Sequence, residues 1–148
     1  MKYAIRPADK SHAELLANIH RRCFPHYWDI NAFNDFFAIE GTHALLAESE
    51  QPVGMMVYRI AGDQADIMTI AVLPEHRRQG LAAALVEKAL ADIATHKIDT
   101  LFLDVEDGNV AAIALYEKYG FSHLRRRKLY YRQKDGTCTD ALVMQRKL

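Results

Sequence analysis

The feature with the most direct chemical meaning is a short basic turn that contains a glycine, Arg77-Arg78-Gln79-Gly80-Leu81-Ala82. It follows an apolar run, Ile67 to Leu73, and opens a run with helical spacing, Leu81 to His96. Backbone N–H groups at the start of a helix have no intrahelical partner, and the helix dipole adds partial positive charge there. Because Gly80 lets the backbone approach a ligand closely, the pattern predicts that residues 77–83 bind a phosphate-bearing cofactor. Taken alone, the same residues also suit an ordinary turn with solvated arginines.

Length and composition limit the class of molecule. The 148 residues predict one domain, residues 1–148, with a substantial core, because half of them are hydrophobic. A formal net charge of zero argues against a general nucleic-acid or membrane-surface binder. No apolar run approaches the ~20 residues that cross a bilayer, and Met1 to Pro7 lacks the long apolar segment of a signal peptide. Two cysteines, Cys23 and Cys138, are too few for a disulfide framework, so we expect a cytoplasmic protein with reduced thiols.

The elements that must position the basic turn follow from hydrophobic spacing. We expect strands at 3–6, 43–48, 53–60, 65–73, 99–106, 123–132 and 139–145, and helices at 11–22, 29–39, 81–96 and 109–119. Ser11 and Glu14 have the spacing of a capping box at the first helix, and Lys134-Asp135-Gly136 suits a hairpin turn. The strand, helix and strand over 65–106 form a βαβ unit, whose strands run parallel. The chain is therefore predicted to be an α+β protein, with a mostly antiparallel sheet and one parallel pair beside the turn.

Two motifs together resemble the GCN5-related N-acetyltransferase (GNAT) superfamily. The first is Arg-x-x-Gly-x-Ala at Arg77 to Ala82, which is similar to the pyrophosphate-binding signature of that superfamily. The second is Asn109 followed by Leu115-Tyr116-Glu117-Lys118-Tyr119-Gly120-Phe121. Either motif alone is weak, but both lie on the expected elements, and the resemblance covers nearly the whole chain. It implies an α/β sandwich with about seven strands, about four helices and a parallel pair whose strands splay apart.

Further residues resemble the RimI-type ribosomal-protein alanine N-acetyltransferases. They are Leu103-Asp104-Val105, Asn109 with Ala112-Ile113-Ala114-Leu115-Tyr116, Tyr130-Tyr131, Asp140-Ala141 with Met144, and Phe24-Pro25 with Trp28. This resemblance implies an enzyme that transfers the acetyl group of acetyl-CoA to the N-terminal α-amine of a protein, such as a small-subunit ribosomal protein. No metal, nucleic acid or membrane partner is expected.

The same resemblance assigns the cofactor contacts. Main-chain groups of the strand before the turn face the pantetheine arm, the backbone of the turn holds the pyrophosphate, and the arginines add charge. Asn109 either caps its helix or bonds the CoA arm, and the two roles are compatible. The implied cofactor-binding residues are Ile70, Ala71, Val72, Arg77, Arg78, Gln79, Gly80, Leu81, Ala82, Ala83 and Asn109.

Two residues are the implied catalysts. Tyr116 is assigned the role of general acid, since the leaving thiolate needs a proton and a phenol with a pKa near 10 is protonated at neutral pH. Asp104 is the candidate base, although the RimI-type pattern has glutamate at this position. Aspartate is shorter by about 1.5 Å, a misplacement that costs activity if direct contact is required, and one bridging water restores the reach. A structural or electrostatic role for Asp104 stays open, with Glu106 as the substitute base.

Aromatic residues are expected to form the acceptor site. Tyr130 and Tyr131 resemble one wall of the family's peptide site, and Phe24 with Trp28 would form the opposite wall. Trp28 suits either an exposed binding residue or a buried core residue. The adjacent basic run, Arg125 to Lys128, suits a solvated strand face better than a nucleic-acid contact because the net charge is zero.

Other functions remain open at this point. A small-molecule amine acetyltransferase would need a closed acidic pocket, and a CoA-binding module without catalysis would fit the departure at Asp104. His20, Cys23 and His26 have the spacing of metal ligands, but they offer only three ligands and Pro25 interrupts the helix. We therefore expect no metal site there.

Overall fold

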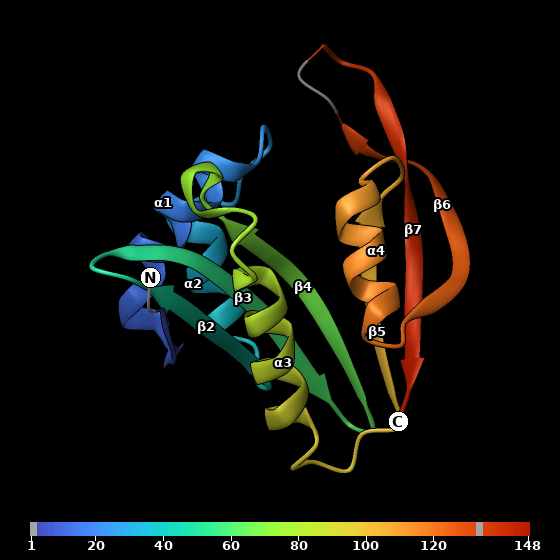
Figure 1. The fold of residues 1–148 in the computed structure, drawn as a ribbon, viewed down its shortest axis with the longest axis horizontal. Coiled ribbons are helices and arrows are strands. Elements are labelled where there is room, and N and C mark those ends of the chain that lie inside the picture. Colours follow the sequence, from blue (N-terminus) through green and yellow to red (C-terminus); the bar gives the residue numbers. More distant parts are fainter. Residues whose placement is uncertain (1–2, 133–134) are drawn as a thin grey trace.

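The computed structural model describes residues 3–132 and 135–148, which form one mixed sheet flanked by helices (Figure 1). The strand order is β1-β2-β3-β4-β5-β7-β6. The strands are β1 (Ala4–Ala8), β2 (Thr42–Glu48), β3 (Pro52–Ala61), β4 (Gln64–Val72), β5 (Thr100–Glu106), β6 (Ser122–Arg132) and β7 (Cys138–Lys147). The helices are α1 (Ala13–Cys23), α2 (Ile30–Phe37), α3 (Leu81–Ile93) and α4 (Val110–Lys118), with short 3-10 turns η1 (Lys10–His12) and η2 (Pro74–His76). The predicted fold class, with seven strands and four helices, is confirmed.

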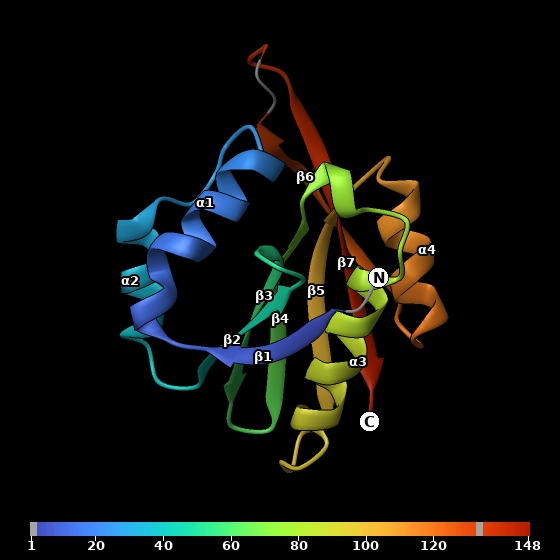
Figure 2. The same cartoon turned by 60° about the vertical axis from the view of Figure 1, so that its left-hand side comes forward.

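The helices cover both faces of the sheet. Figure 2 shows α1 and α2 on one side and α3 and α4 on the other. Each of α1 and α3 turns one apolar stripe to the sheet: α1 buries Leu16 and Ile19, and α3 buries Leu85, Val86 and Ala89. No helix in the described part of the chain is long and apolar enough to span a bilayer, and the cytoplasmic location stays a prediction.

The parallel pair is short, and its two strands then separate. β4 and β5 pair from Gln64↔Thr100 to Ile67↔Leu103, and no further. At that point β4 carries a bulge: Ile67 pairs with Tyr58 of β3 and Thr69 with Val57, so Met68 is the extra residue. Beyond the bulge β4 follows β3 alone, whereas β5 continues along β7 to Glu106. The splay that the resemblance implied is therefore present, and it begins at Met68.

The C-terminal hairpin is irregular. Arg127 pairs with Ala141 and Tyr131 with Thr139, so three residues of β6, 128–130, lie opposite Asp140 alone. Leu129 has a left-handed backbone (φ 54°), and its N–H donates to Oδ1 of Asp140 at 2.9 Å. Of the predicted hairpin turn, Lys134 lies outside the described residues, while Asp135 accepts hydrogen bonds from the N–H and hydroxyl of Thr137.

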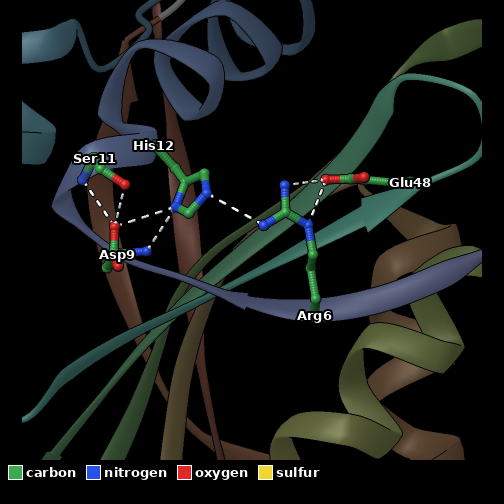
Figure 3. Close-up of polar contacts among 5 residues, drawn as sticks. All are labelled: Arg6, Asp9, Ser11, His12 and Glu48. Carbon is green, nitrogen blue, oxygen red and sulfur yellow. Dashed lines mark hydrogen bonds and ion pairs between the residues drawn. The ribbon is translucent and has the colours of Figure 1, made fainter.

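The predicted capping box at Ser11 is wrong. Figure 3 shows that Asp9 is the capping residue: its Oδ1 accepts from the N–H of Ser11 at 2.9 Å and from the Ser11 hydroxyl. The backbone N–H of Asp9 in turn donates to Nδ1 of His12, which closes a capping box two residues earlier than expected. Asp9, and not Ser11, is therefore the N-cap, and the 3-10 turn η1 that it caps precedes α1. Arg6, paired with Glu48 at 2.5 Å, contacts the other ring nitrogen of His12 and ties this start to β2.

Gly41 provides a test of the close contact between the turn that joins α2 to β2 and strand β3. It has a φ of +88°, and a Cβ at this position would lie 2.0 Å from the carbonyl oxygen of Ile60. Gly41→Ala is expected to lower the free energy of unfolding by more than about 2 kcal/mol. The steric clash of the new Cβ with the backbone adds to the strain of a left-handed alanine. Gly62→Ala is the matched control, since Gly62 has a φ of +62° with no atom within 4 Å, and it should cost about 1 kcal/mol. Urea unfolding measures both, and equal losses would contradict the packing argument.

Candidate active site

The basic turn after β4 presents a row of free backbone donors. Arg78 and Gly80 both have left-handed backbones, with φ of 63° and 76°. The first backbone N–H at the start of α3 with a partner among the described residues is that of Ala84, which donates to the Gly80 carbonyl at 3.0 Å. The preceding N–H groups, from 78 to 83, have no such partner. Successive N–H groups around left-handed residues at a helix start form a concave anion site.

The space in front of this turn is open. A Cβ built on Gly80 meets nothing within 4 Å, so the backbone there is accessible. The two arginines differ, however. Nε of Arg77 donates to the carbonyl of Val72 at 2.8 Å, which makes its side chain part of the scaffold of the turn. Arg78 is exposed and its guanidinium contacts no other described side chain, so it is the arginine free to add charge. The turn thus fits a diphosphate, held mainly by backbone donors.

A residue that the sequence analysis did not single out braces this turn. Tyr3, just before β1, donates its hydroxyl to Oε1 of Gln79 and lies 3.3 Å from Nδ1 of His76. No sequence motif marks Tyr3, because the contact spans more than seventy positions and only the fold creates it. The Gln79 side chain is therefore a structural member of the turn.

The splay leaves one edge of β4 without a strand partner. Ile70, Ala71 and Val72 pair with β3 on one side, and the pairing with β5 has already ended at Ile67. Main-chain donors and acceptors on that edge are available to an extended ligand. The predicted arm-binding residues thus lie next to the predicted diphosphate turn, in one continuous run of chain.

Tyr116 lies on α4 and is 4% exposed. Its ring packs edge-on against Phe121, with centroids 5.9 Å apart, and burial raises its pKa to about 12. Its hydroxyl has no hydrogen-bond partner among the described residues. Every fully buried side-chain oxygen in that part of the chain does have a partner, so the hydroxyl oxygen of Tyr116 is not fully buried. The hydroxyl therefore reaches solvent as a protonated, uncommitted donor.

Asp104 lies on β5, directly after the last residue of the parallel pair. Its Oδ2 accepts a hydrogen bond from Nη1 of Arg127 at 3.0 Å, and the guanidinium carbon of Arg127 lies 3.8 Å from the ring centroid of Tyr130. The other candidate base, Glu106, accepts from the hydroxyl of Thr139 at 2.7 Å. Both carboxylates are thus held by partners from the C-terminal hairpin.

Tyr131 is half-buried beside these residues. Its pKa is raised, first by burial and then by electrostatic interaction with nearby Asp104, Tyr130, Glu106 and Tyr116. The contacts of Arg127 with Asp104 and with the Tyr130 ring join one candidate base directly to the predicted tyrosine wall.

The opposite wall is partly buried and is built around a histidine. Trp28 packs against Phe33 and Phe36 and stacks on His20, with ring centroids 4.9 Å apart. The ring of Phe24 also packs against that of His20, with ring centroids 4.4 Å apart. Trp28 is therefore neither fully exposed nor fully buried, and it lies between the two alternatives that the sequence left open. No cluster of three metal-ligating side chains occurs in residues 3–132 and 135–148.

The comparisons with known proteins agree with this geometry. Residues 13–121 match the sequence model of the "Acetyltransferase (GNAT) family". The chain belongs to this family. Its relatives include the [Ribosomal protein bS18]-alanine N-acetyltransferase of Escherichia coli (strain K12), 36% identical over 99 residues, which are 67% of this chain and 66% of that protein. The aligned segment thus spans just under two thirds of the relative's length.

Solved structures extend the likeness to nearly the whole chain. The ribosomal-protein-S18-alanine N-acetyltransferase from Escherichia coli superposes with a TM-score of 0.91 at 28% identity, over 99% of this chain and 94% of that one. Arabidopsis thaliana NAA60 in complex with acetyl-CoA shares the fold, with a TM-score of 0.85 at 22% identity over 99% of each chain. The resemblance to the GNAT superfamily and to its RimI-type members is therefore confirmed, while the roles of single residues stay predictions.

His20 gives this GNAT domain a pH-dependent stability. Burial lowers its pKa from 6.5 to about 4, so between these values the unfolded chain binds a proton that the folded chain does not. The contribution of His20 to the free energy of unfolding is intact above pH 6.5 and is lost as the pH falls toward 4. Between pH 7 and pH 5 the wild type should lose about 2 kcal/mol more unfolding free energy than His20→Gln. Urea unfolding at both pH values measures this, with His26→Gln as the exposed control, and parallel losses in all three proteins would refute a buried neutral imidazole.

Proposed function

We propose that this chain transfers the acetyl group of acetyl-CoA to the N-terminal α-amine of a protein, with acceptors of the ribosomal-protein alanine type. The combined sequence and fold similarity to the Escherichia coli ribosomal-protein-alanine enzyme carries the proposal. Three features near the splay support it independently. They are the unpaired N–H groups of the turn, the unpaired edge of β4 and the Tyr116 hydroxyl.

Acetyl-CoA would lie along β4 and the turn that follows it. The diphosphate suits the N–H groups of residues 78–83, with added charge from Arg78. The pantetheine arm suits the free edge at Ile70, Ala71 and Val72. Asn109 caps α4, since its Oδ1 accepts from the N–H of Ala112 at 3.2 Å, which leaves its amide NH₂ as a donor toward the arm.

The reaction is direct attack of the neutral amine on the thioester carbonyl. A C–N bond forms and the C–S bond breaks, while N–H groups on the free edge of β4 polarise the carbonyl oxygen. Asp104 takes the proton of the amine, directly or through water, and Tyr116 protonates the departing thiolate. Little work is required of the base, because holding an α-amine with a pKa of about 8 neutral at pH 7 costs roughly 1 kcal/mol, against nearer 5 for lysine.

The ion pair with Arg127 is compatible with this role. Arg127 engages only Oδ2 of Asp104, and a carboxylate has further acceptor positions on both oxygens. Oδ1 is therefore available to the amine or to a bridging water. Arg127, stacked on Tyr130, fixes the carboxylate in one orientation while the proton is transferred.

The acceptor class is tested with a peptide that begins with alanine. The enzyme should acetylate it, whereas the same peptide with a blocked N-terminus and an internal lysine should be acetylated at a rate lower by on the order of 10²-fold or more. Transfer to polyamines or amino sugars in preference to both peptides would indicate a small-molecule acetyltransferase instead. CoA binding by calorimetry without transfer to any amine would indicate a binding module.

Removing the hydroxyl of Tyr116 tests the general acid. Tyr116→Phe should lower kcat by on the order of 10²-fold, because the thiolate then leaves without a positioned proton donor. The affinity for CoA should stay within twofold, since the ring and its packing are retained. Tyr119→Phe is the control at the C-cap of the same helix, where the lost hydroxyl bonds Glu87 instead. Steady-state turnover and calorimetry measure both variants, and unchanged turnover in Tyr116→Phe would remove its catalytic role.

A further inference from the structure

We propose that His20 is a positioning residue, which fastens the acceptor wall at Phe24 and Trp28 to β4 at the place where that strand leaves β5. The inference rests on the proposed function, because it assigns a purpose to the wall that the acceptor would contact.

The two ring nitrogens of His20 make two different hydrogen bonds. Its Nδ1 accepts from the backbone N–H of Trp28 at 3.0 Å, so this nitrogen carries no proton. The proton of the neutral ring then lies on Nε2, which is 3.2 Å from the hydroxyl oxygen of Thr69. With 3% of its surface exposed, the imidazole is a buried polar link between the segment that carries Trp28 and strand β4.

Both ends of this link matter for the site. Thr69 directly follows the bulge residue Met68 and precedes Ile70, where the strand edge assigned to the pantetheine arm begins. Trp28 lies in the segment between α1 and α2, one residue before the aspartate that caps α2. The imidazole therefore helps to set the distance between the proposed acceptor wall and β4, together with the Cys23 thiol, which lies 3.5 Å from the Val72 carbonyl oxygen.

Ring contacts make the link rigid. The indole of Trp28 lies nearly parallel to the imidazole, with 16° between the planes, and Phe33 meets the same ring edge-on at 5.8 Å. An apolar residue at position 20 would preserve this packing, but it would leave the backbone N–H of Trp28 without its acceptor. The imidazole thus combines aromatic packing with one acceptor and one donor in the same plane.

Substitutions can separate the two hydrogen bonds. An asparagine places its Oδ1 near the position of Nδ1, so His20→Asn keeps an acceptor for Trp28 and loses the contact with Thr69. His20→Gln reaches toward Thr69 and loses the acceptor for Trp28. Thr69→Val removes only the hydroxyl and leaves His20 in place. His26→Asn is the matched control, because His26 is an exposed histidine of the same segment.

The expected result is a change in the KM for the peptide acceptor alone. His20→Gln should raise the KM for an alanine-starting peptide about tenfold, the factor that corresponds to 1.4 kcal/mol, with kcat and the KM for acetyl-CoA within twofold. His20→Asn and Thr69→Val should give smaller increases in the same parameter, and His26→Asn none. Trp28 is the only tryptophan in the chain, so its emission and its quenching by acrylamide report directly on the wall. Both should change in His20→Gln and not in His26→Asn.

Two outcomes would overturn the proposal. One is an unchanged peptide KM and unchanged Trp28 emission in a folded His20 variant; the other is an equal rise in the KM of both substrates. Urea midpoints identify a variant that fails to fold, and Thr69→Val then decides the matter with His20 intact. If the wild type acetylates no amine, the proposed function has failed, and Trp28 emission alone still decides whether His20 holds the wall.

Discussion

The separation of β4 from β5 is the constraint on which the rest of the site depends. Four residue pairs hold the parallel strands together, and the bulge at Met68 then turns β4 away. An unpaired strand edge inside a sheet is unfavourable unless something satisfies its donors and acceptors. In the proposed function, the extended arm of the cofactor pairs with this edge as an additional strand would. The fold therefore keeps the edge open and covers its surroundings with helices.

The electrostatics of the site are divided between backbone and side chains. In the turn proposed to bind the diphosphate, Arg78 and Gly80 have left-handed backbones, and the side chain of Arg77 bonds the Val72 carbonyl. At the proposed acceptor end, side chains dominate, and Arg127 pairs with Asp104. The basic run of β6 is thus partly structural, since Arg126 also bridges Asp107 and Asp140. The run is exposed, as expected for a solvated strand face, and two of its arginines also pair with aspartates of the fold.

The sequence predicted those features that local spacing determines. The order of strands and helices, the glycine turn and the cap of α4 by Asn109 all follow from residues within a few positions of one another. Two kinds of feature were missed: the choice between two neighbouring capping residues, and contacts between residues far apart in the sequence. Asp9 displaced Ser11 as the helix cap, and nothing in the spacing distinguished two good capping residues so close together. The brace of Tyr3 on Gln79 and the link from His20 to Thr69 arise only once the sheet is assembled. His20 was noticed in the sequence, but for metal-like spacing rather than for burial.

The two walls of the proposed acceptor site are held in different ways, and the difference has a physical reason. On the hairpin side, Leu129 adopts a left-handed backbone at a cost on the order of 1 kcal/mol, and Asp140 offsets it by accepting the Leu129 N–H. The resulting bulge points Arg127 and Tyr130 at one another and places Arg127 on Asp104. That wall is exposed, so ion pairs can be exchanged there as an acceptor enters. The opposite wall is packed against the core, where a charge would be costly, and a neutral imidazole fixes it through hydrogen bonds instead. In the proposed reaction, a rigid wall facing an adjustable one suits a site that admits a charged amine and then holds it, deprotonated, against a thioester.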